Sequence, residues 1–173
     1  MVERAPFRVV REVDGIEIRR YDKMILATVK ELSDNGAFGY LFDYITGTNS
    51  SRRKIPMTAP VISTPEKIPM AVPVISDEKS FSFVMPSGYT IDTIPLPEDP
   101  RVELQQLPER TVAVITFRGR AGEKDVERRT GELVSVLKRN NIKPKGAMFL
   151  MRYNPPFTPG FMRTNEVGVE IEG

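Results

Sequence analysis

The sequence predicts an α+β fold made of two pseudo-symmetric ββαββ units, whose strands form a distorted antiparallel β-barrel with two helices packed on it. The second half of the chain repeats the first. A shift of 86 residues places Val102–Leu104 on Ile16–Ile18, and Val112–Ile115 on Leu26–Val29. Strand-like and helix-like patterns also follow one another in the same order in both halves. Repetition of this kind predicts two copies of one supersecondary unit that together bury a shared core.

Two β-rich runs open the first unit. Ile16 and Ile18 alternate with polar neighbours, which is the period of a half-buried strand. A second run, Met24–Lys30, follows after the polar pair Asp22 and Lys23. So short a connection predicts that the two runs form a β-hairpin.

An amphipathic helix is expected next. Ser33 or Asp34 can cap its start, and Gly47 provides a stop after its last turn. Its large apolar residues have the spacing i, i+3, i+4 and i+7, and are Phe38, Leu41, Phe42 and Ile45. This spacing places all four on one face of the helix, which suits either a hydrophobic core or an apolar ligand.

A proline-rich motif follows and occurs twice, as KIPMTAPVIS at Lys54–Ser63 and as KIPMAVPVIS at Lys67–Ser76. Proline excludes a helix and has no N–H to donate, so each copy is expected to be an extended strand that pairs along one edge only. The strand Ser80–Met85 then completes the first unit.

The second unit has the stronger helix, expected from about Gly122 to Arg139. Acidic residues lie in its first turn and basic residues in its last, as the helix macrodipole favours. The predicted buried stripe consists of Val126, Thr130, Leu133, Val134 and Leu137. A strand at Ala147–Tyr153 and a last strand ending near Ile171 follow it.

Composition narrows the possible functions. The chain has 173 residues, a formal net charge of +2, and neither cysteine nor histidine. This length suits a single domain over residues 1–173, with an internal repeat at about residues 7–86 and 101–172. The small net charge argues against nucleic acid as a partner. The first residues lack the apolar core of a signal peptide, so we expect a cytoplasmic monomer that does not enter a membrane.

Several separate blocks of the sequence resemble the SOUL/haem-binding protein family. The blocks occur in family order and span nearly the whole chain: Lys54–Val61, Phe83–Tyr89, Pro95–Val102, Tyr153–Pro156 and Arg163–Val167. The resemblance implies the fold described above. It also implies a shallow apolar groove along the first helix that binds haem or a related tetrapyrrole. The positions that line this groove in relatives read Asn35, Phe38, Phe42 and Asp43 here.

Two surfaces are therefore predicted to bind the ligand. The first is the helix stripe of Phe38, Leu41, Phe42 and Ile45, whose alternative role is core packing. The second is a proline-rich loop with unusually many large apolar groups, namely Phe157, Phe161 and Met162, followed by Arg163. The planar guanidinium of Arg163 suits a propionate, although a salt bridge to Glu166 is an alternative role for it.

Iron ligation is restricted by the composition. Because histidine is absent, only Met, Tyr or Lys could be an axial ligand, and Tyr40 and Tyr44 are the candidates on the first helix. We therefore expect haem or porphyrin to bind loosely, with no metal site in the protein itself.

Two other classes of function stay open at this point. An enzyme, such as a hydrolase of a hydrophobic small molecule, would use Glu170 or Glu166 as general base, and a raised glutamate pKa would favour it. A module that binds effectors or other proteins would need neither residue.

Overall fold

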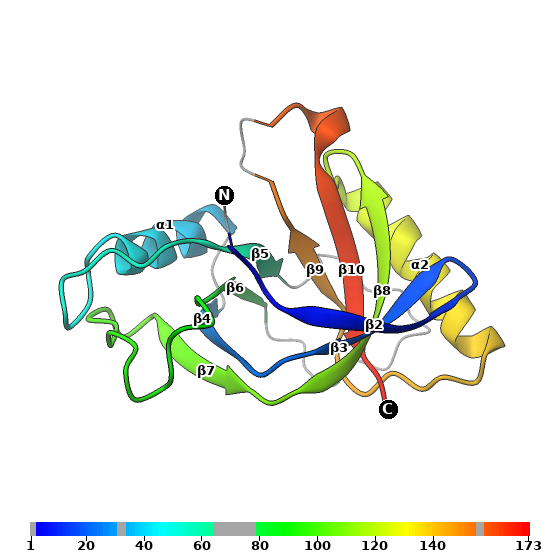
Figure 1. The fold of residues 1–173 in the computed structure, drawn as a ribbon. Helices are drawn as coiled ribbons and strands as arrows, with labels where there is room; N and C mark the ends of the chain where they lie inside the picture. Colours follow the sequence, from blue (N-terminus) through cyan, green and yellow to red (C-terminus); the bar gives the residue numbers. More distant parts are fainter. Residues whose placement is uncertain (1–2, 31–33, 64–78, 155–157) are drawn as a thin grey trace. The chain divides into compact units, whose positions relative to one another are not determined.

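The computed structural model describes residues 3–30, 34–63, 79–154 and 158–173 (Figure 1). These residues divide into two compact units. The described parts of unit 1 are residues 3–6, 22–30, 34–63 and 79–109, and those of unit 2 are residues 7–21, 110–154 and 158–173.

Unit 1 is a mostly antiparallel sheet with one helix on it. Its elements are β1 (Glu3–Arg4), β4 (Met24–Lys30), α1 (Asp34–Ile45), β5 (Thr58–Ser63), β6 (Ser80–Val84) and β7 (Glu103–Leu107). The strands pair in the order β7, β4, β6, β5, and β1 adds a short parallel pairing to β5. Helix α1 packs on β4 and β6. The core between them contains Leu41, Tyr44, Ile45 and Phe83.

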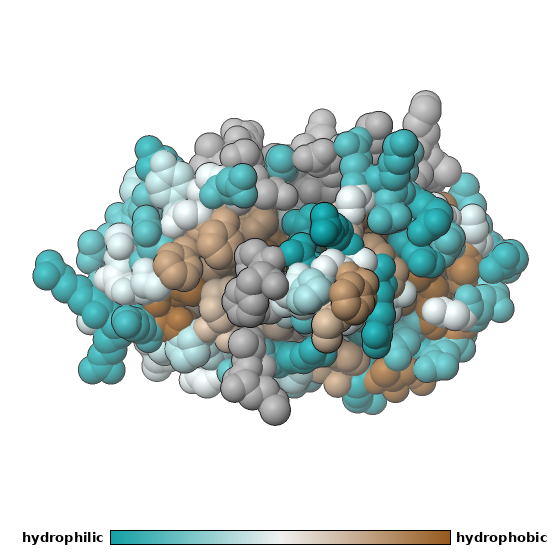
Figure 2. Space-filling view, turned by 90° about the horizontal axis from the view of Figure 1, so that it is seen from above, coloured by the Kyte–Doolittle hydropathy of each residue, from teal (hydrophilic) through white to brown (hydrophobic). Residues whose placement is uncertain are grey.

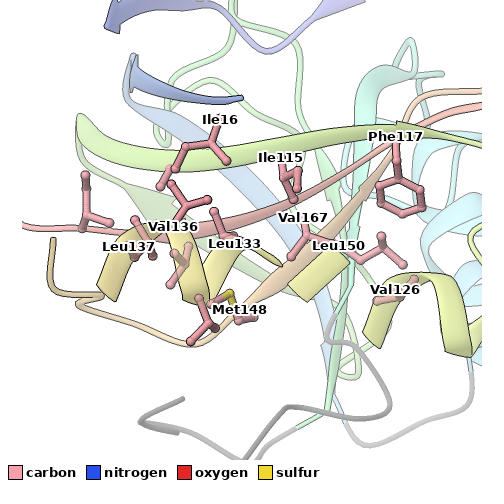
Figure 3. Close-up of a cluster of buried hydrophobic side chains, with 14 of the residues drawn as sticks. Ile16, Ile115, Phe117, Val126, Leu133, Val136, Leu137, Met148, Leu150 and Val167 are labelled. Atoms are coloured by element: carbon pink, nitrogen blue, oxygen red, sulfur yellow. The ribbon is translucent and has the colours of Figure 1, made fainter. Parts of the chain in front are cut away.

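Unit 2 likewise combines an antiparallel sheet with one long helix. Its elements are β2 (Phe7–Val13), β3 (Ile16–Tyr21), β8 (Arg110–Arg118), α2 (Glu123–Arg139), β9 (Phe149–Arg152), the short 3₁₀ helix η1 (Gly160–Met162) and β10 (Thr164–Glu170). The strands pair in the order β2, β3, β8, β10, β9. The core of this unit contains Leu133 and Leu137 of α2 together with Val167 of β10 (Figure 3).

The α+β class and the repeated ββαββ order are confirmed. The order β3–β4–α1–β5–β6 recurs as β7–β8–α2–β9–β10. Within the described residues, however, the strands of each unit form an open sheet, so the predicted closure into a barrel is not found. The expectation of a single domain stays a prediction.

The predicted hairpin between the first two strands is wrong. Strand β3 pairs with β2 and β8, whereas β4 pairs with β6 and β7. The first strand of each ββαββ repeat thus joins the sheet that contains the rest of the other repeat. Both edges of β3 and both edges of β4 are occupied by these partners, which leaves no edge for the two strands to share.

The two helices match their predictions to different degrees. The whole predicted stripe of α2 is buried, and Val136 joins it. In α1 only Leu41 and Ile45 of the predicted stripe are buried, whereas Phe38 and Phe42 are exposed. Ala37 and Tyr44 complete the buried face instead. The helix ends at Ile45, and Ser33, a predicted cap, lies outside the described residues.

The first proline motif forms β5, but it does not pair along one edge only. Thr58 lies opposite Val84 of β6 and also opposite Glu3 of β1. The pairing with β6 is irregular between Thr58 and Val61, where Pro60 lacks an N–H. The carbonyl of Ala59 still accepts a hydrogen bond from the Ala5 amide at 2.8 Å. The second copy, Lys67–Ser76, lies outside the described residues.

The exchange of strands predicts that half of the chain cannot fold alone. A chain that ends at Ser87 lacks β7 and β8, so β4 and β3 each lose one of their two neighbours. We expect this fragment to lack a cooperative urea transition and near-ultraviolet circular dichroism, while the full chain shows both. A fragment that unfolds cooperatively would contradict the exchange.

Candidate functional site

The exposed face of α1 carries two aromatic rings. Phe38 is 37% exposed and Phe42 is 47% exposed, and their ring centroids lie 5.9 Å apart with only 15° between the ring planes. Phe38 also meets the buried ring of Phe83 edge-on, at 5.4 Å and 70°. This edge-to-face contact is a favoured aromatic geometry and holds Phe38 in place. The face is therefore a fixed, flat apolar surface.

One polar residue of this face, Asp43, carries a negative charge, whereas Asn35 is neutral. Asn35 and Asp43 are exposed, as are Phe38 and Phe42. Helix α1 contains no lysine or arginine. The helix itself thus offers no cation to a carboxylate-bearing ligand, and Asp43 would repel one.

Tyr44 of α1 is not placed to bind iron, whereas Tyr40 as an axial ligand stays a prediction. Tyr44 is buried, and its hydroxyl donates a hydrogen bond to the Pro95 carbonyl at 2.5 Å. Burial, helped by the charge of Tyr89, raises the pKa of Tyr44 to about 12, which disfavours the phenolate. The ring of Tyr40 lies under the Arg101 guanidinium, with 4.6 Å from the guanidinium carbon to the ring centroid. The described residues also contain no cluster of acidic side chains that could hold a metal ion.

The described residues of the predicted binding loop belong to unit 2, whereas α1 belongs to unit 1. Phe161 and Met162 belong to η1 and are exposed. The Nε of Arg163 donates a hydrogen bond to the Thr158 carbonyl at 2.9 Å. Phe157 lies outside the described residues. Figure 2 shows one face of the molecule, on which hydrophobic residues lie at the surface among hydrophilic ones.

Two cavities in the described part of unit 1 do not suit a large flat ligand. One, of about 80 Å³, is lined by Thr58, Met85 and Tyr89 among others, and the Thr58 hydroxyl there has no hydrogen-bond partner. A pocket for a drug-sized ligand usually has about 300–1,000 Å³. A wider, shallow depression of about 840 Å³ is lined by two prolines and polar residues, with no aromatic side chain.

Sequence reasoning missed a buried ionic network in unit 2. The guanidinium of Arg19 on β3 donates two hydrogen bonds to the Glu166 carboxylate on β10, at 2.8 and 2.5 Å. Glu166 also accepts hydrogen bonds from the hydroxyls of Tyr153, at 2.5 Å, and Thr116, at 2.8 Å. Arg19 donates two further hydrogen bonds within β3, one to the Tyr21 hydroxyl and one to the Glu17 carboxylate. All hydrogen-bonding capacity of the Glu166 carboxylate is thereby used.

The network holds Glu166 in its ionised form. Burial by itself would raise the pKa of Glu166, but the hydrogen bonds from Arg19 and Tyr153 outweigh burial and lower the pKa below its usual value of 4.5. Burial and the negative partners raise the pKa of Tyr153, which therefore stays protonated. A general base for catalysis near neutral pH needs a raised glutamate pKa, so this geometry argues against Glu166 in that role.

Glu170, the other predicted general base, ends β10 and is partly buried. Its negative charge acts on Arg110, whose pKa is lowered mainly by burial. Glu170 belongs to unit 2, whereas the exposed aromatic face of α1 belongs to unit 1. The structure therefore adds no support for Glu170 as a catalytic residue.

Comparison with known proteins assigns the family. Residues 2–170 match the SOUL heme-binding protein family. The chain belongs to the SOUL family. The match covers nearly all of the sequence, as the five blocks of the SOUL resemblance predicted. No curated protein matches the sequence of this SOUL chain.

Solved structures share the fold of this SOUL chain at low sequence identity. The EcmrR C-terminal domain matches with a TM-score of 0.64 and 9% identity, over 91% of this chain and 96% of that one. A hydrolase encoded by lin2189 from Listeria innocua matches with a TM-score of 0.62 and 10% identity, over 94% of both chains. SAV2435 bound to tetraphenylphosphonium matches with a TM-score of 0.52 and 11% identity, over 91% of this chain and 94% of that one. Identities this low establish the fold alone.

None of the helices in the described part of the chain is long and apolar enough to cross a membrane.

The buried ion pair predicts a large loss of stability on neutralisation of one partner. Glu166→Gln removes the buried counter-ion of Arg19 and leaves only the partly exposed Glu17 beside its guanidinium. We expect a loss of about 3 kcal/mol in the free energy of unfolding, measured by urea denaturation at pH 7. Glu17→Gln is the matched control, because Glu17 contacts the same guanidinium but is partly exposed. That change should cost less than about 1 kcal/mol.

The pH dependence provides a second control for this prediction. The pKa of Glu166 is lower in the folded chain than in the unfolded chain. Its contribution to stability is therefore complete above pH 4.5 and is lost as the pH falls through the folded pKa. The difference between the wild type and Glu166→Gln should shrink over that acidic range. Equal stability of the two proteins at pH 7 would contradict the ionic role of Glu166.

Proposed function

We propose that this chain binds haem or a related flat tetrapyrrole through ring contact with Phe38 and Phe42, without histidine ligation. Membership in the SOUL heme-binding family supports a ligand of this class. The observation that carries the proposal is the near-parallel pair of exposed rings on α1, anchored edge-on by Phe83. A monomeric soluble protein seldom exposes a fixed aromatic face without a use for it.

The residues of this face fit the ring of a tetrapyrrole better than its iron. Two phenylalanines offer apolar area to a macrocycle, and burial of apolar area stabilises a complex by about 25 cal/mol per Å². The sequence has no histidine or cysteine, and Tyr44 uses its hydroxyl within the core. Iron, when the bound tetrapyrrole contains it, would supply redox or ligand-exchange chemistry, but no described residue of this face is placed to ligate it. Ring contact should therefore dominate the affinity.

Contact of the ligand with Phe161, Met162 and Arg163 stays a prediction. They lie in unit 2, and the proposal does not depend on them. The hydrolase alternative also lacks a supporting observation, because the pKa of Glu166 is lowered and its carboxylate is fully hydrogen-bonded.

A second candidate ligand is favoured by the charge of the face. Asp43 is exposed on α1, and the helix carries no basic side chain. An aromatic cation would be attracted by Asp43 and by the electron-rich ring faces, whereas the propionates of haem would be repelled. SAV2435, which shares the fold, has been solved with the aromatic cation tetraphenylphosphonium. The chain would then act as an effector-binding module with the same aromatic site.

A titration with haem and with iron-free protoporphyrin tests the proposal. We expect both to bind with similar affinity, at micromolar dissociation constants or weaker, which corresponds to about −8 kcal/mol. Phe42→Asp should weaken both by at least about tenfold, or about 1.4 kcal/mol, because it removes one ring and adds a repulsive charge. Absorbance measures haem binding, and fluorescence measures porphyrin binding.

Leu96→Asp is the matched control for this variant. Leu96 lies in the same unit, is 58% exposed and does not belong to α1, so the substitution adds the same negative charge outside the helix. Its affinity for both ligands should equal that of the wild type. Haem that binds far more tightly than protoporphyrin would reveal an iron ligand and contradict ring contact as the main source of affinity.

Charge reversal at Asp43 separates the two candidate ligands. Asp43→Lys should strengthen protoporphyrin binding by a few fold, because it replaces a repulsion of the propionates with an attraction. The same change should weaken tetraphenylphosphonium binding by a similar factor. Isothermal titration calorimetry measures both. If the wild type binds tetraphenylphosphonium and not protoporphyrin, the effector-binding function replaces the tetrapyrrole one.

A further inference from the structure

One end of unit 2 carries exposed apolar side chains that no function above requires. Phe161 is 78% exposed, the highest value among the large hydrophobic side chains of the described residues, and its neighbour Met162 is 55% exposed. Both belong to η1, in the segment that leads into β10. We call the residues 118–122 and 158–163 the η1 tip, because the two segments meet there.

The η1 tip is held together by contacts between its two segments. The Gly119 amide donates a hydrogen bond to the Arg163 carbonyl at 3.1 Å, and the Asn165 side-chain amide donates one to the Gly119 carbonyl at 2.7 Å. Gly160 touches the Arg120 side chain so closely that a Cβ at Gly160 would lie 2.6 Å from the Arg120 Cγ. In Figure 1 the orange-red segment before β10 lies beside the turn after β8. The tip therefore presents its side chains from a fixed backbone.

The charge of the η1 tip is positive. Arg118, Arg120 and Arg163 belong to it, and neither of its segments contains Asp or Glu. Arg118 and Arg120 are exposed. Glu123, the nearest acidic residue along the chain after the first segment, already belongs to the first turn of α2. Glu166, which follows the second segment, is buried and paired with Arg19. The η1 tip thus combines three positive charges with two exposed apolar side chains.

We propose that the η1 tip docks on an anionic phospholipid surface. Phe161 and Met162 would enter the boundary between headgroups and acyl chains, and the arginines would pair with lipid phosphates. A phenylalanine flanked by basic residues is the combination that peripheral attachment requires, because apolar burial and attraction to anionic lipid add to each other. Arginine suits phosphate through its planar, multiply donating guanidinium. Because neither segment of the tip contains an acidic residue, its charge is complementary to a polyanionic surface.

The chain allows a direct spectroscopic test, because it contains no tryptophan. Phe161→Trp places a single indole at the tip and retains its aromatic character. With vesicles of phosphatidylcholine containing about one third phosphatidylserine, we expect a blue shift of its fluorescence, and little shift with phosphatidylcholine alone. The shift should diminish as salt is added. Leu96→Trp is the matched control, since Leu96 is also exposed but lies in unit 1, and it should show no shift.

Vesicle sedimentation of the full chain tests the two components separately. One double variant removes the apolar side chains, by Phe161→Ser with Met162→Ser. The other reverses two charges, by Arg118→Glu with Arg120→Glu. Each should reduce the fraction bound to anionic vesicles by about tenfold or more. Thermal melting should confirm that both variants stay folded, because all four substituted side chains are exposed. Of these, Arg120 also packs against Gly160. Protoporphyrin binding should be unchanged in the variant with Arg118→Glu and Arg120→Glu, which separates this inference from the proposed function.

Three results would overturn the proposal. One is an absent blue shift for Phe161→Trp with anionic vesicles. Another is an equal shift for Leu96→Trp, which would mean that attachment is not localised. The third is binding to polyglutamate without binding to vesicles, which would identify an acidic protein surface as the partner.

Discussion

The exchange of first strands between the two ββαββ repeats is the constraint on which the rest of the structure depends. Strand β3 is paired on β8, and β7 is paired on β4, so neither sheet consists of one repeat alone. Each compact unit therefore needs both halves of the sequence. In unit 2 the exchange also has a chemical consequence, because β3 carries Arg19 to the carboxylate of Glu166.

The Arg19–Glu166 pair is better explained by specificity of strand pairing than by catalysis. Desolvation of two charges offsets much of their attraction, so a buried pair adds little net stability compared with apolar residues. Removal of one partner is costly, however, and so is a change of register that separates them. Four hydrogen bonds on one carboxylate fix the position of β3 relative to β8 and β10. We interpret the pair as a device that selects the correct partner for the exchanged strand.

The sequence was sufficient to predict the features that depend on the spacing of apolar residues and on the internal repeat. The strong pattern of α2 gave its stripe of buried residues, and the repeat gave the order of elements. Alternation of apolar residues cannot say which strand lies next to which, so the exchange of β3 was not predictable. Alternation along β10 could not reveal the burial of Glu166, because consecutive residues of this strand are buried. For α1, spacing alone could not tell that Ala37 and Tyr44 face the core while Phe38 and Phe42 do not.

In the proposed function, the exposed rings of Phe38 and Phe42 would contact a flat ligand without a metal ligand. Their contact with Phe83 connects the site to the core of unit 1. The most direct test is an ¹⁵N-labelled amide spectrum of the chain during titration with iron-free protoporphyrin. The account predicts ring-current shifts concentrated on the amides of α1 around residues 38–42, with smaller shifts in unit 2. Shifts that are absent from α1 and concentrated elsewhere would contradict it.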